Sequence, residues 1–464
     1  MSEIRGQRAN TFGIPHLTSV ATALIALLAL AAANGFPFVF ADTGGYLARP
    51  FERTLALGRS ALYGLLLASG IRWNFWPIIV VQGLLALWLI WLALRVYHGE
   101  ELGVFAFVVA LLILCTSLPW YTGMLMPDIF VPLAALALLL LAFSHDQLTR
   151  MEELALLGLV AFAMASHLTI LALAAALLVA LFALKLLAVR LALPSPRLLH
   201  PVLAAAAGIA LALVSNVAIT GQLRLTPGGS TFLFARLLQD GLVARYLDDH
   251  CPHANIRLCS FRAELPRDSD VWLWANSPLA KLGGWEAFEP EARRIILGSI
   301  FDHPWLHTRT AIVASLEQFV TVATGEGFHA KDNWHAESML KRYAPETAAS
   351  FAASRQQHDA FEFRILNIIH VPVALGSFVL LPVSAVLLRR SNPQLALLAA
   401  MVFFALLANA AICGIFSNPN ARYQSRIVPL AVLATFMIAV DWACARGAVS
   451  DMSRIDRAHA PEPP

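Results

Sequence analysis

The sequence predicts an all-α polytopic membrane protein with about ten transmembrane helices, and three observations support this fold class. Hydrophobic residues make up 58% of the 464 residues and charged residues only 14%, whereas a soluble globular chain is about 45–50% apolar and about 25% charged. The apolar residues form repeated uncharged runs close to the roughly 20 residues that cross a hydrocarbon core. The lysines and arginines gather in alternate loops, which is typical of a membrane protein with a fixed orientation.

The predicted spans fall into two groups with one long polar stretch between them. The first group forms an N-terminal module (1–219) and the second a C-terminal module (367–445). The polar stretch (220–366) is predicted to be a mainly helical domain, and the tail (446–464) to be disordered. The spans are placed at 17–37, 74–95, 102–118, 127–144, 153–166, 168–187, 198–219, 367–388, 395–416 and 426–445.

The basic residues predict an inner-membrane protein with both termini in the cytoplasm and 220–366 on the periplasmic side. The loop 119–126 and the turn at 166–167, which would face outward, carry no Lys or Arg. A cleaved signal peptide is the alternative for the N-terminus, but the apolar run is longer than a usual signal core, so a retained span is favoured. The basic residues of the predicted cytoplasmic side are Arg5, Arg8, Arg95, Arg150, Lys185, Arg190, Arg197, Arg389, Arg390 and Arg446.

The first outward loop (38–73) places an acid directly after the first span. Asp42 lies in the stretch "FADTGGYLARPFERTLALGRS", and its place at a span end avoids the roughly 2.5–3.5 kcal/mol that a carboxylate costs at a helix centre. Gly44-Gly45 would allow a sharp turn, and amphipathic helices on the outer surface would follow. Asp42 is therefore either an ordinary interfacial acid or a general base for an incoming hydroxyl group.

Arginines on the outward side break the positive-inside pattern. One interpretation is that these arginines have no function and are tolerated, because other loops already fix the orientation of the protein in the membrane. The functional interpretation is that these arginines bind an anionic ligand, since a guanidinium group binds phosphate through a planar fork of donors. The residues concerned are Arg49, Arg53, Arg59, Arg72, Arg422 and Arg426.

Three more positions on the predicted outer face carry chemically useful side chains. Asp128 begins the fourth span, either as an acid favoured by the helix dipole or as a partner of Asp42 in binding substrate hydroxyls or a divalent cation. His167 lies at the turn between the fifth and sixth spans, where it either satisfies freed backbone groups or binds a ligand. Arg422 and Tyr423 open the last span as an interfacial anchor or as a phosphate clamp.

The polar region contains a predicted disulfide and a group of tryptophans. Cys251 and Cys259 are expected to pair if the region faces an oxidising compartment. The segment 301–324 is interpreted as an amphipathic interface helix rather than an eleventh span, because an extra span would invert everything after it. The tryptophans are expected to pack in a core rather than stack on sugar rings; they are Trp272, Trp274, Trp285, Trp305 and Trp334.

Other functional classes leave no signature in the chain. The histidines of the polar region have no zinc-ligand spacing. No Gly-rich phosphate-binding loop, Ser-His-Asp arrangement or nucleic-acid-binding motif is present. The sequence therefore requires no metal and predicts no nucleic-acid partner, although a divalent cation between acids remains open.

The order and sidedness of these motifs resemble the GT-C superfamily of membrane glycosyltransferases. The resemblance is to the glycosyltransferase family 39 type, which includes protein mannosyltransferases and the aminoarabinose transferase of lipid A. It is carried by "FADTGGY", "LMPDIF", "ARYQSRIVP" and the paired short spans of "GLVAFAMASHLTILALAAAL". The chain departs from the family at Thr43, where a second acid is common, and at His167, where lysine is common.

The resemblance implies an inverting transferase that moves a sugar from a polyprenyl-phosphate donor to a lipid, glycan or protein acceptor on the outer face. Asp42 would be the general base, with Asp128 as a second catalytic acid, and Arg422 would hold the donor phosphate. The residues expected to bind substrate are Tyr46, Arg53, Arg59, His167, Arg422 and Tyr423. A lipid-linked glycan ligase or polymerase, a transporter or flippase of lipid-linked sugars, and a membrane scaffold are the alternatives.

Overall fold

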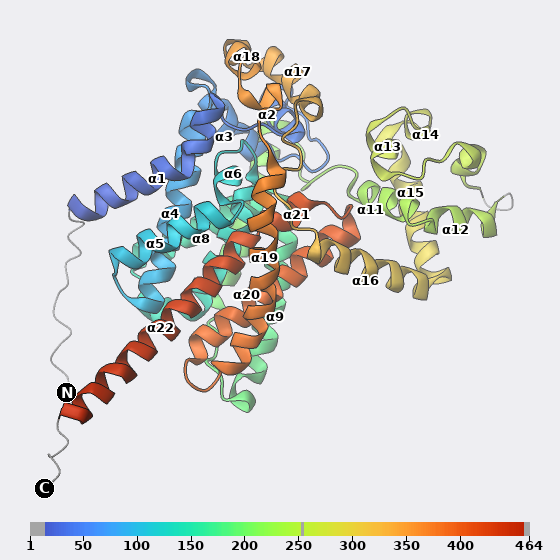
Figure 1. The fold of residues 1–464 in the computed structure, drawn as a ribbon. Helices are drawn as coiled ribbons and strands as arrows, with labels where there is room; N and C mark the ends of the chain where they lie inside the picture. Colours follow the sequence, from blue (N-terminus) through green and yellow to red (C-terminus); the bar gives the residue numbers. More distant parts are fainter. Residues whose placement is uncertain (1–13, 252–254, 459–464) are drawn as a thin grey trace, which may run out of the picture.

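The computed structural model describes residues 14–251 and 255–458. Within these residues the only regular secondary structure is helical, and no strand is present. Seven helices are long and apolar enough to cross a membrane, which agrees with the predicted all-α membrane fold class (Figure 1). They are α1 (Ile14–Asn34), α4 (Trp76–His98), α9 (Leu168–Leu191), α10 (Leu199–Thr220), α19 (Phe363–Leu387), α20 (Pro393–Phe416) and α22 (Val428–Ala458).

Three of the ten predicted spans are helices of less than spanning length. They are α5 (Leu102–Cys115), α7 (Phe130–Phe143) and α8 (Arg150–Ser166), with 14, 14 and 17 residues. At about 1.5 Å per residue, each falls short of the roughly 30 Å of a hydrocarbon core. Every predicted span therefore corresponds to a helix, but only seven of these helices reach spanning length.

α7 is the central helix of the bundle. Its sequence is apolar on all sides, and 13 of its 14 residues are buried. It packs against α4, α8, α9, α10, α20 and α22. A helix that is hydrophobic all round belongs inside a protein. The short turn η2 (Pro127–Ile129), which precedes α7 and carries Asp128, is consequently buried as well.

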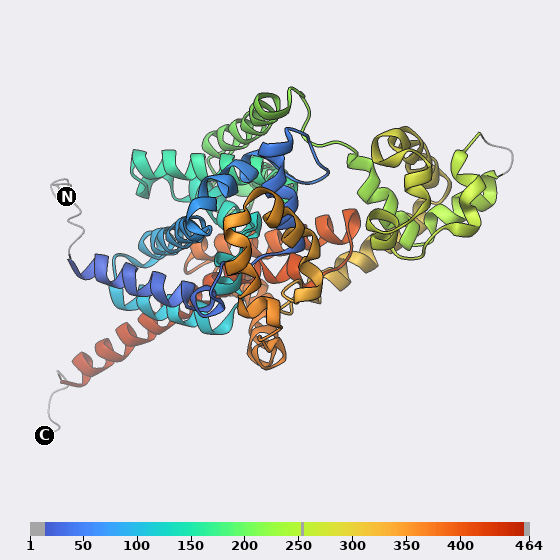
Figure 2. The same cartoon turned by 90° about the horizontal axis from the view of Figure 1, so that it is seen from above.

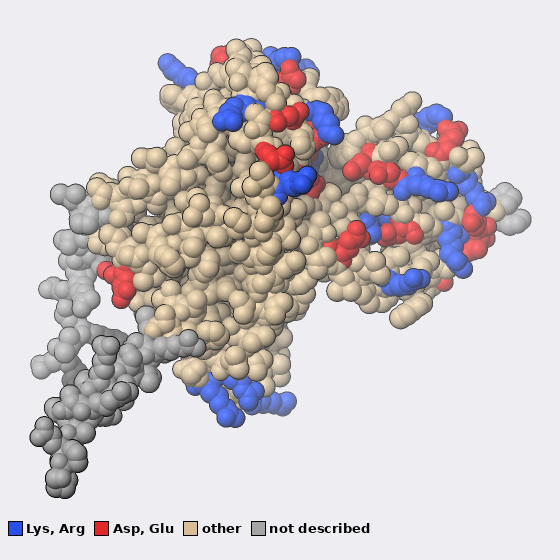
Figure 3. Space-filling view, viewed as in Figure 1, with Lys and Arg blue, Asp and Glu red and all other residues tan. Residues whose placement is uncertain are grey.

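The two ends of the bundle differ in charge and in what they carry. The start of α1 and the end of α22 lie on the side away from α12–α15 in both views (Figures 1 and 2). On the face shown in Figure 3, basic side chains gather at the end formed by α9 and the α19–α20 connection, and the surface above them is largely uncharged. The exposed basic residues there are Lys185, Arg190, Arg389 and Arg390.

The opposite end, which we call the site face, is built from short helices packed on one another. They are α2 (Ala41–Glu52), α3 (Ala61–Gly70), η1 (Ile71–Trp73), α6 (Leu118–Thr122), η5 (Ala330–Asn333), α17 (Trp334–Tyr343), α18 (Pro345–Ala352), η6 (Arg355–His358) and α21 (Ala421–Ser425). α2 and α3 lie where two amphipathic helices were predicted; α2 is amphipathic, whereas α3 is apolar nearly all round. The predicted sharp turn at Gly44-Gly45 is wrong, because both glycines lie inside α2. A Cβ on Gly44 would lie 2.8 Å from the Cα of Ala336 in α17, so the glycine allows the two helices to touch.

Backbone pairing ties the first loop to the start of α7. The N–H of Phe38 donates to the carbonyl of Gly123 at 2.8 Å, and the N–H of Leu125 donates to the carbonyl of Phe38 at 2.8 Å. The Gln356 side chain also holds Val39 through two hydrogen bonds, of 3.0 and 2.7 Å. These contacts fix the segment that leads into Asp42 beside the segment that leads into Asp128.

The polar region 220–366 has two parts with different cores. Residues 229–302, which we call the lobe, bury their own apolar cluster around Phe234, Trp272 and Phe288, whereas Phe328, Leu340 and Phe351 join the main core of the bundle. Cys251 and Cys259 form a disulfide within the lobe, as predicted, with Cα atoms 5.9 Å apart. The helices of the lobe are α11 (Gly229–Gln239), α12 (Leu242–His250), η4 (Arg257–Glu264), α13 (Ser269–Trp274), α14 (Pro278–Lys281) and α15 (Gly284–Asp302).

α16 (Pro304–Val320) connects the lobe to the bundle (Figure 1). It packs along α20 through Ala314, whose carbonyl oxygen would lie 2.6 Å from a Cβ on Gly414. Its outward side exposes Ile312, Val313 and Leu316. The helix therefore exposes an apolar side, and it is not among the helices of spanning length. Its place at a membrane interface stays a prediction from the sequence.

The C-terminal tail is more regular than predicted. α22 continues as a helix to Ala458 instead of ending near residue 445. The residues beyond the last span include alanines, arginines and a methionine, which have good helix propensity, so the helix continues past the apolar stretch. The rest of the predicted disordered tail (459–464) lies outside the described residues, as do Arg5 and Arg8.

Candidate functional site

Asp42 lies in the first turn of α2, at the edge of a space between the bundle and the lobe. A carboxylate there is favoured by the positive end of the helix dipole. Thr43 fixes the entry to the helix, because its Oγ1 accepts from the N–H of Phe40 at 3.0 Å and donates to the carbonyl of Leu125 at 3.1 Å. Thr43 therefore has a structural use at the entry to α2.

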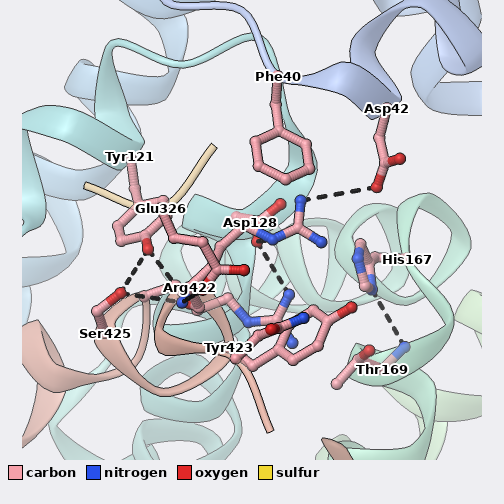
Figure 4. Close-up of polar contacts among 12 residues, drawn as sticks. Phe40, Asp42, Tyr121, Asp128, His167, Thr169, Glu326, Arg422, Tyr423 and Ser425 are labelled. Atoms are coloured by element: carbon pink, nitrogen blue, oxygen red, sulfur yellow. Dashed lines mark hydrogen bonds and ion pairs between the residues drawn. The ribbon is translucent and has the colours of Figure 1, made fainter. Parts of the chain in front are cut away.

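Two guanidinium groups flank the Asp42 carboxylate. Arg59 donates to Oδ1 in an ion pair, and Nη1 of Arg422 lies 3.6 Å from Oδ2 (Figure 4). A separation of 3.6 Å is too long for a hydrogen bond. Oδ2 is thus the oxygen left to accept a proton or a hydrogen bond from a ligand. With 23% of its side chain exposed, Asp42 can be reached from solvent.

Arg422 is held from several directions, and one of its nitrogens has no hydrogen bond. Its backbone N–H donates to Oε2 of Glu326 at 2.8 Å, and its guanidinium carbon lies 3.9 Å from the ring centroid of Phe40. Nη1 is buried without a hydrogen-bond partner among the described residues. A buried donor left unsatisfied is costly. Arg422 also lines two of the cavities described below, so its guanidinium group is suited to binding an anionic ligand.

Asp128, predicted as a second catalytic acid, is buried and does not line the cavities that Asp42 borders. Its side chain is fully buried, with Arg426 Nη1 3.0 Å and Arg422 Nε 3.9 Å from Oδ1. Long side chains from α21 and its C-cap residue thus cover the carboxylate that η2 presents. This geometry suits Asp128 to holding the two arginines in place rather than to contacting a ligand.

The predicted option of a divalent cation between the two acids does not fit these residues. A guanidinium group of Arg422 lies between Asp42 and Asp128, and each acid already pairs with a second arginine (Arg59 or Arg426). A cation would have to displace these positive groups from both carboxylates. The one group of three potential metal ligands in the described part of the chain is His145, Glu153 and His200, which does not include either acid.

His167 forms the N-cap of α9 at the break between α8 and α9. Its Nδ1 accepts the backbone N–H of Thr169 at 3.1 Å, which leaves the ring proton on Nε2. Burial, together with the charge of Arg426, lowers the pKa of His167 to about 3. The ring is therefore a neutral hydrogen-bond donor at physiological pH, rather than the cation that a lysine would supply at this turn.

Three cavities meet at Asp42 and Arg59. The polar cavity, of about 550 Å³, reaches towards the lobe and is lined by Arg236, Asp270, Asn418, Arg422 and Tyr423, among others. The apolar cavity, of about 370 Å³, lies between α9 and α20 and is lined by His167, Leu168, Ala172, Ile412 and Phe416, among others. The tryptophan cavity, of about 630 Å³, is lined by Trp274, Trp285 and Trp334, with His335 beside them. An acid with two arginines thus lies where a polar, an apolar and an aromatic space converge.

Two predicted substrate-binding residues are not at these cavities. Arg53 is exposed at the C-cap of α2, where its backbone is left-handed (φ 52°) and turns the chain away from the site. Tyr46 is 1% exposed, packs on Tyr63 and donates to the carbonyl of Gly58 at 3.3 Å. Burial raises the pKa of Tyr46, so it is a neutral support for α2. By contrast, Arg59, His167, Arg422 and Tyr423 all line at least one of the cavities.

Sequence reasoning missed Glu326 and Phe40, the two residues that orient Arg422. Glu326 stands between Gly325 and Gly327, whose φ angles are +121° and +78°. A Cβ on Gly327 would lie 1.7 Å from a ring atom of Phe40, so only glycine fits there. The Gly-Glu-Gly pattern could have indicated Glu326, because two flanking glycines favour a tight turn that fixes the direction of the glutamate side chain.

Comparison with known proteins adds no relative. No protein family profile, curated protein or solved structure that was compared matches this chain.

Proposed function

We propose that this chain is an integral membrane glycosyltransferase that moves a sugar from a polyprenyl-phosphate donor to an acceptor hydroxyl group. The observation that carries the proposal is the place of Asp42 at the junction of the apolar and polar cavities, with the unbonded Arg422 Nη1 beside it. A donor of this kind has an apolar tail, an anionic phosphate and a polar sugar. The apolar cavity, Arg422 and the polar cavity offer matching surroundings to the three parts in that order.

The proposed reaction is a single displacement at the anomeric carbon. Oδ2 of Asp42 takes the proton of the acceptor hydroxyl as the new C–O bond forms. The bond between the anomeric carbon and the phosphate oxygen breaks at the same time, and its electron pair leaves with polyprenyl phosphate. Because the attack comes from the side opposite the leaving group, the configuration at the anomeric carbon inverts.

Arg422 would stabilise the leaving group. The phosphodiester of the donor carries one negative charge, and the released monoester gains a second. A guanidinium group beside the phosphate stabilises the transition state, where this charge develops, more than the ground state. This difference lowers the activation barrier. Nε2–H of neutral His167 would add a hydrogen bond from the apolar side, and Arg59 would keep Oδ1 of Asp42 engaged so that Oδ2 faces the acceptor.

The charge distribution supports an orientation with the site face outside the cytoplasm. Exposed basic side chains mark the opposite end of the bundle, as the positive-inside rule expects for a cytoplasmic side. The disulfide of the lobe agrees with an oxidising compartment. The sugar would then be transferred on the periplasmic side of the inner membrane.

The proposal is tested by measuring release of the lipid product. The full-length protein in lipid nanodiscs would be given undecaprenyl phosphate carrying glucose, mannose, galactose, arabinose or aminoarabinose, and free undecaprenyl phosphate would be measured by mass spectrometry. Asp42→Asn is expected to lower its release by about 10²–10⁴-fold, which is the usual contribution of a general base. Asp248→Asn is the matched control, because Asp248 also pairs with an arginine but lies in the lobe, away from the cavities.

Two results would contradict the proposal. One is release by Asp42→Asn at the rate of the natural protein. The other is an absence of release from all five donors by the natural protein. A flippase would move the donors between leaflets without releasing undecaprenyl phosphate, so the same assay separates the two functions.

A further inference from the structure

The tryptophans of the polar region do not share one core, which corrects the expectation from the sequence. Trp272 is fully buried in the lobe, but Trp274 is 52% exposed and Trp334 is 69% exposed. Trp274, Trp285 and Trp334 line the tryptophan cavity beside Asp42. Large apolar side chains left uncovered around a cavity are a common mark of a binding site.

The cavity has two walls that come from different parts of the fold. Trp274 and Trp285 belong to the lobe, whereas Trp334 begins α17 on the site face. The rings of Trp274 and Trp285 are tilted by 55° with centroids 5.1 Å apart, so they are not stacked face to face on each other. A molecule in the cavity would thus lie between aromatic rings on both sides.

The same cavity carries polar groups that an apolar ligand would leave unsatisfied. Asp42, Arg59 and His335 line it together with the tryptophans. Burial lowers the pKa of His335, so its neutral ring offers one donor and one acceptor. A pyranose ring needs this combination, because its C–H face is apolar while its rim carries hydroxyl groups that both donate and accept. A prenyl chain would cover the charged groups without satisfying them.

We propose that the tryptophan cavity binds sugar rings of the acceptor, which makes the acceptor a glycan rather than a bare lipid or a peptide. This inference rests on the proposed function, since it assigns the acceptor side of the same reaction. The cavity ends at Asp42, where the hydroxyl to be deprotonated must lie. The apolar cavity reaches Asp42 from the α9–α20 side, so the donor and the acceptor would meet at the carboxylate from different directions.

The test measures sugar binding without turnover. The full-length Asp42→Asn protein in detergent would be titrated with hexasaccharides of α-1,4-glucose, β-1,4-glucose, β-1,4-mannose and α-1,5-arabinose, followed by saturation-transfer NMR. At least one is expected to bind saturably. Adding Trp274→Ala and Trp334→Ala together should weaken that binding by about tenfold or more, as the loss of central aromatic contacts usually does. Phenylalanine at both positions should restore part of the affinity, because a smaller aromatic face remains.

Trp305→Ala is the matched control, since Trp305 is 76% exposed but does not line the cavity; its hexasaccharide binding should equal that of the parent. The proposal is overturned if no hexasaccharide binds, or if the double alanine variant binds as tightly as the parent. It is also overturned if that variant instead loses affinity for undecaprenyl phosphate, because the cavity would then hold lipid. Sugar binding without product release from any donor would reject the proposed function but support the sugar site. Product release without sugar binding would support the proposed function but reject the sugar site.

Discussion

At the scale of single residues, the two acids that look equivalent in the sequence have opposite surroundings. Asp42 is 23% exposed at the cavities, whereas the side chain of Asp128 is only 1% exposed and pairs with Arg426. The sequence separation of that pair is 298 residues, so no local pattern reveals it. Hydropathy shows that an acid stands at a span end, but it does not show which acid faces an open space. The place of Asp42 was therefore predictable, and the burial of Asp128 was not.

Asp128→Asn is expected to damage folding rather than chemistry alone. The change leaves the buried Arg422 and Arg426 without their shared carboxylate, and removing one partner of a buried ion pair typically costs about 3–5 kcal/mol. Asp42→Asn should have a much smaller effect on stability, because that carboxylate is partly exposed. Thermal unfolding of both variants in the same detergent, followed by the loss of monodisperse protein, compares them. Equal melting temperatures for the two variants would contradict the positioning role of Asp128.

His167 gives a prediction about pH. Its pKa is about 3 in the folded chain and about 6.5 in an unfolded one, so below pH 6.5 the unfolded state binds a proton that the folded state does not. Stability therefore falls as the pH drops below 6.5, by up to about 2 kcal/mol at pH 5 from this group. Melting curves at pH 7.5, 6.5 and 5 should show a smaller acid loss for His167→Gln than for the natural protein. An unchanged acid loss in the variant would mean that His167 is not a buried neutral ring.

At the scale of elements, helices at the ten predicted positions could be expected, because a run of uncharged residues has few alternatives in a bilayer. The short lengths of α5, α7 and α8 were harder to predict. α7, for example, is surrounded by other helices rather than by lipid, so it does not need to span the hydrocarbon core. The two-part division of 220–366 also escaped prediction, because α17 is held by long-range packing on α2. Arg53 ends α2 in a left-handed conformation, whereas Arg59, six residues later in the chain, pairs with Asp42.

The contact between α2 and α17 should be required for a working site. A Cβ on Gly44 would lie 2.8 Å from backbone and 2.9 Å from the Met339 side chain, so Gly44→Val must push the helices apart. Overpacking of this kind typically costs about 1–3 kcal/mol, and it would displace Asp42 on the same helix. Product release should fall even at temperatures where the variant is folded. Gly158→Ala is the control, because a Cβ there meets nothing within 4 Å; equal activity of the two variants would contradict this account.

At the scale of the whole molecule, the separate pieces form one arrangement around Asp42. The bundle supplies an apolar cavity between α9 and α20, and the lobe supplies a polar and an aromatic wall. α16 joins them on the side of α20 (Figure 1). The outer face predicted from charge and the site predicted from motifs therefore belong to the same end of the bundle. The role proposed for the lobe, which no sequence motif indicated, rests on its tryptophans and on its border with the polar cavity.

The most direct test of the central claim is a cryo-EM structure of the full-length protein in nanodiscs with undecaprenyl phosphate. We expect density for the phosphate within hydrogen-bond distance of Arg422 Nη1 and near His167, with the prenyl chain leaving through the apolar cavity between α9 and α20. Asp42 should remain beside the phosphate with Oδ2 facing the polar cavity. A phosphate bound elsewhere, with Arg422 and the apolar cavity unchanged, would contradict the account.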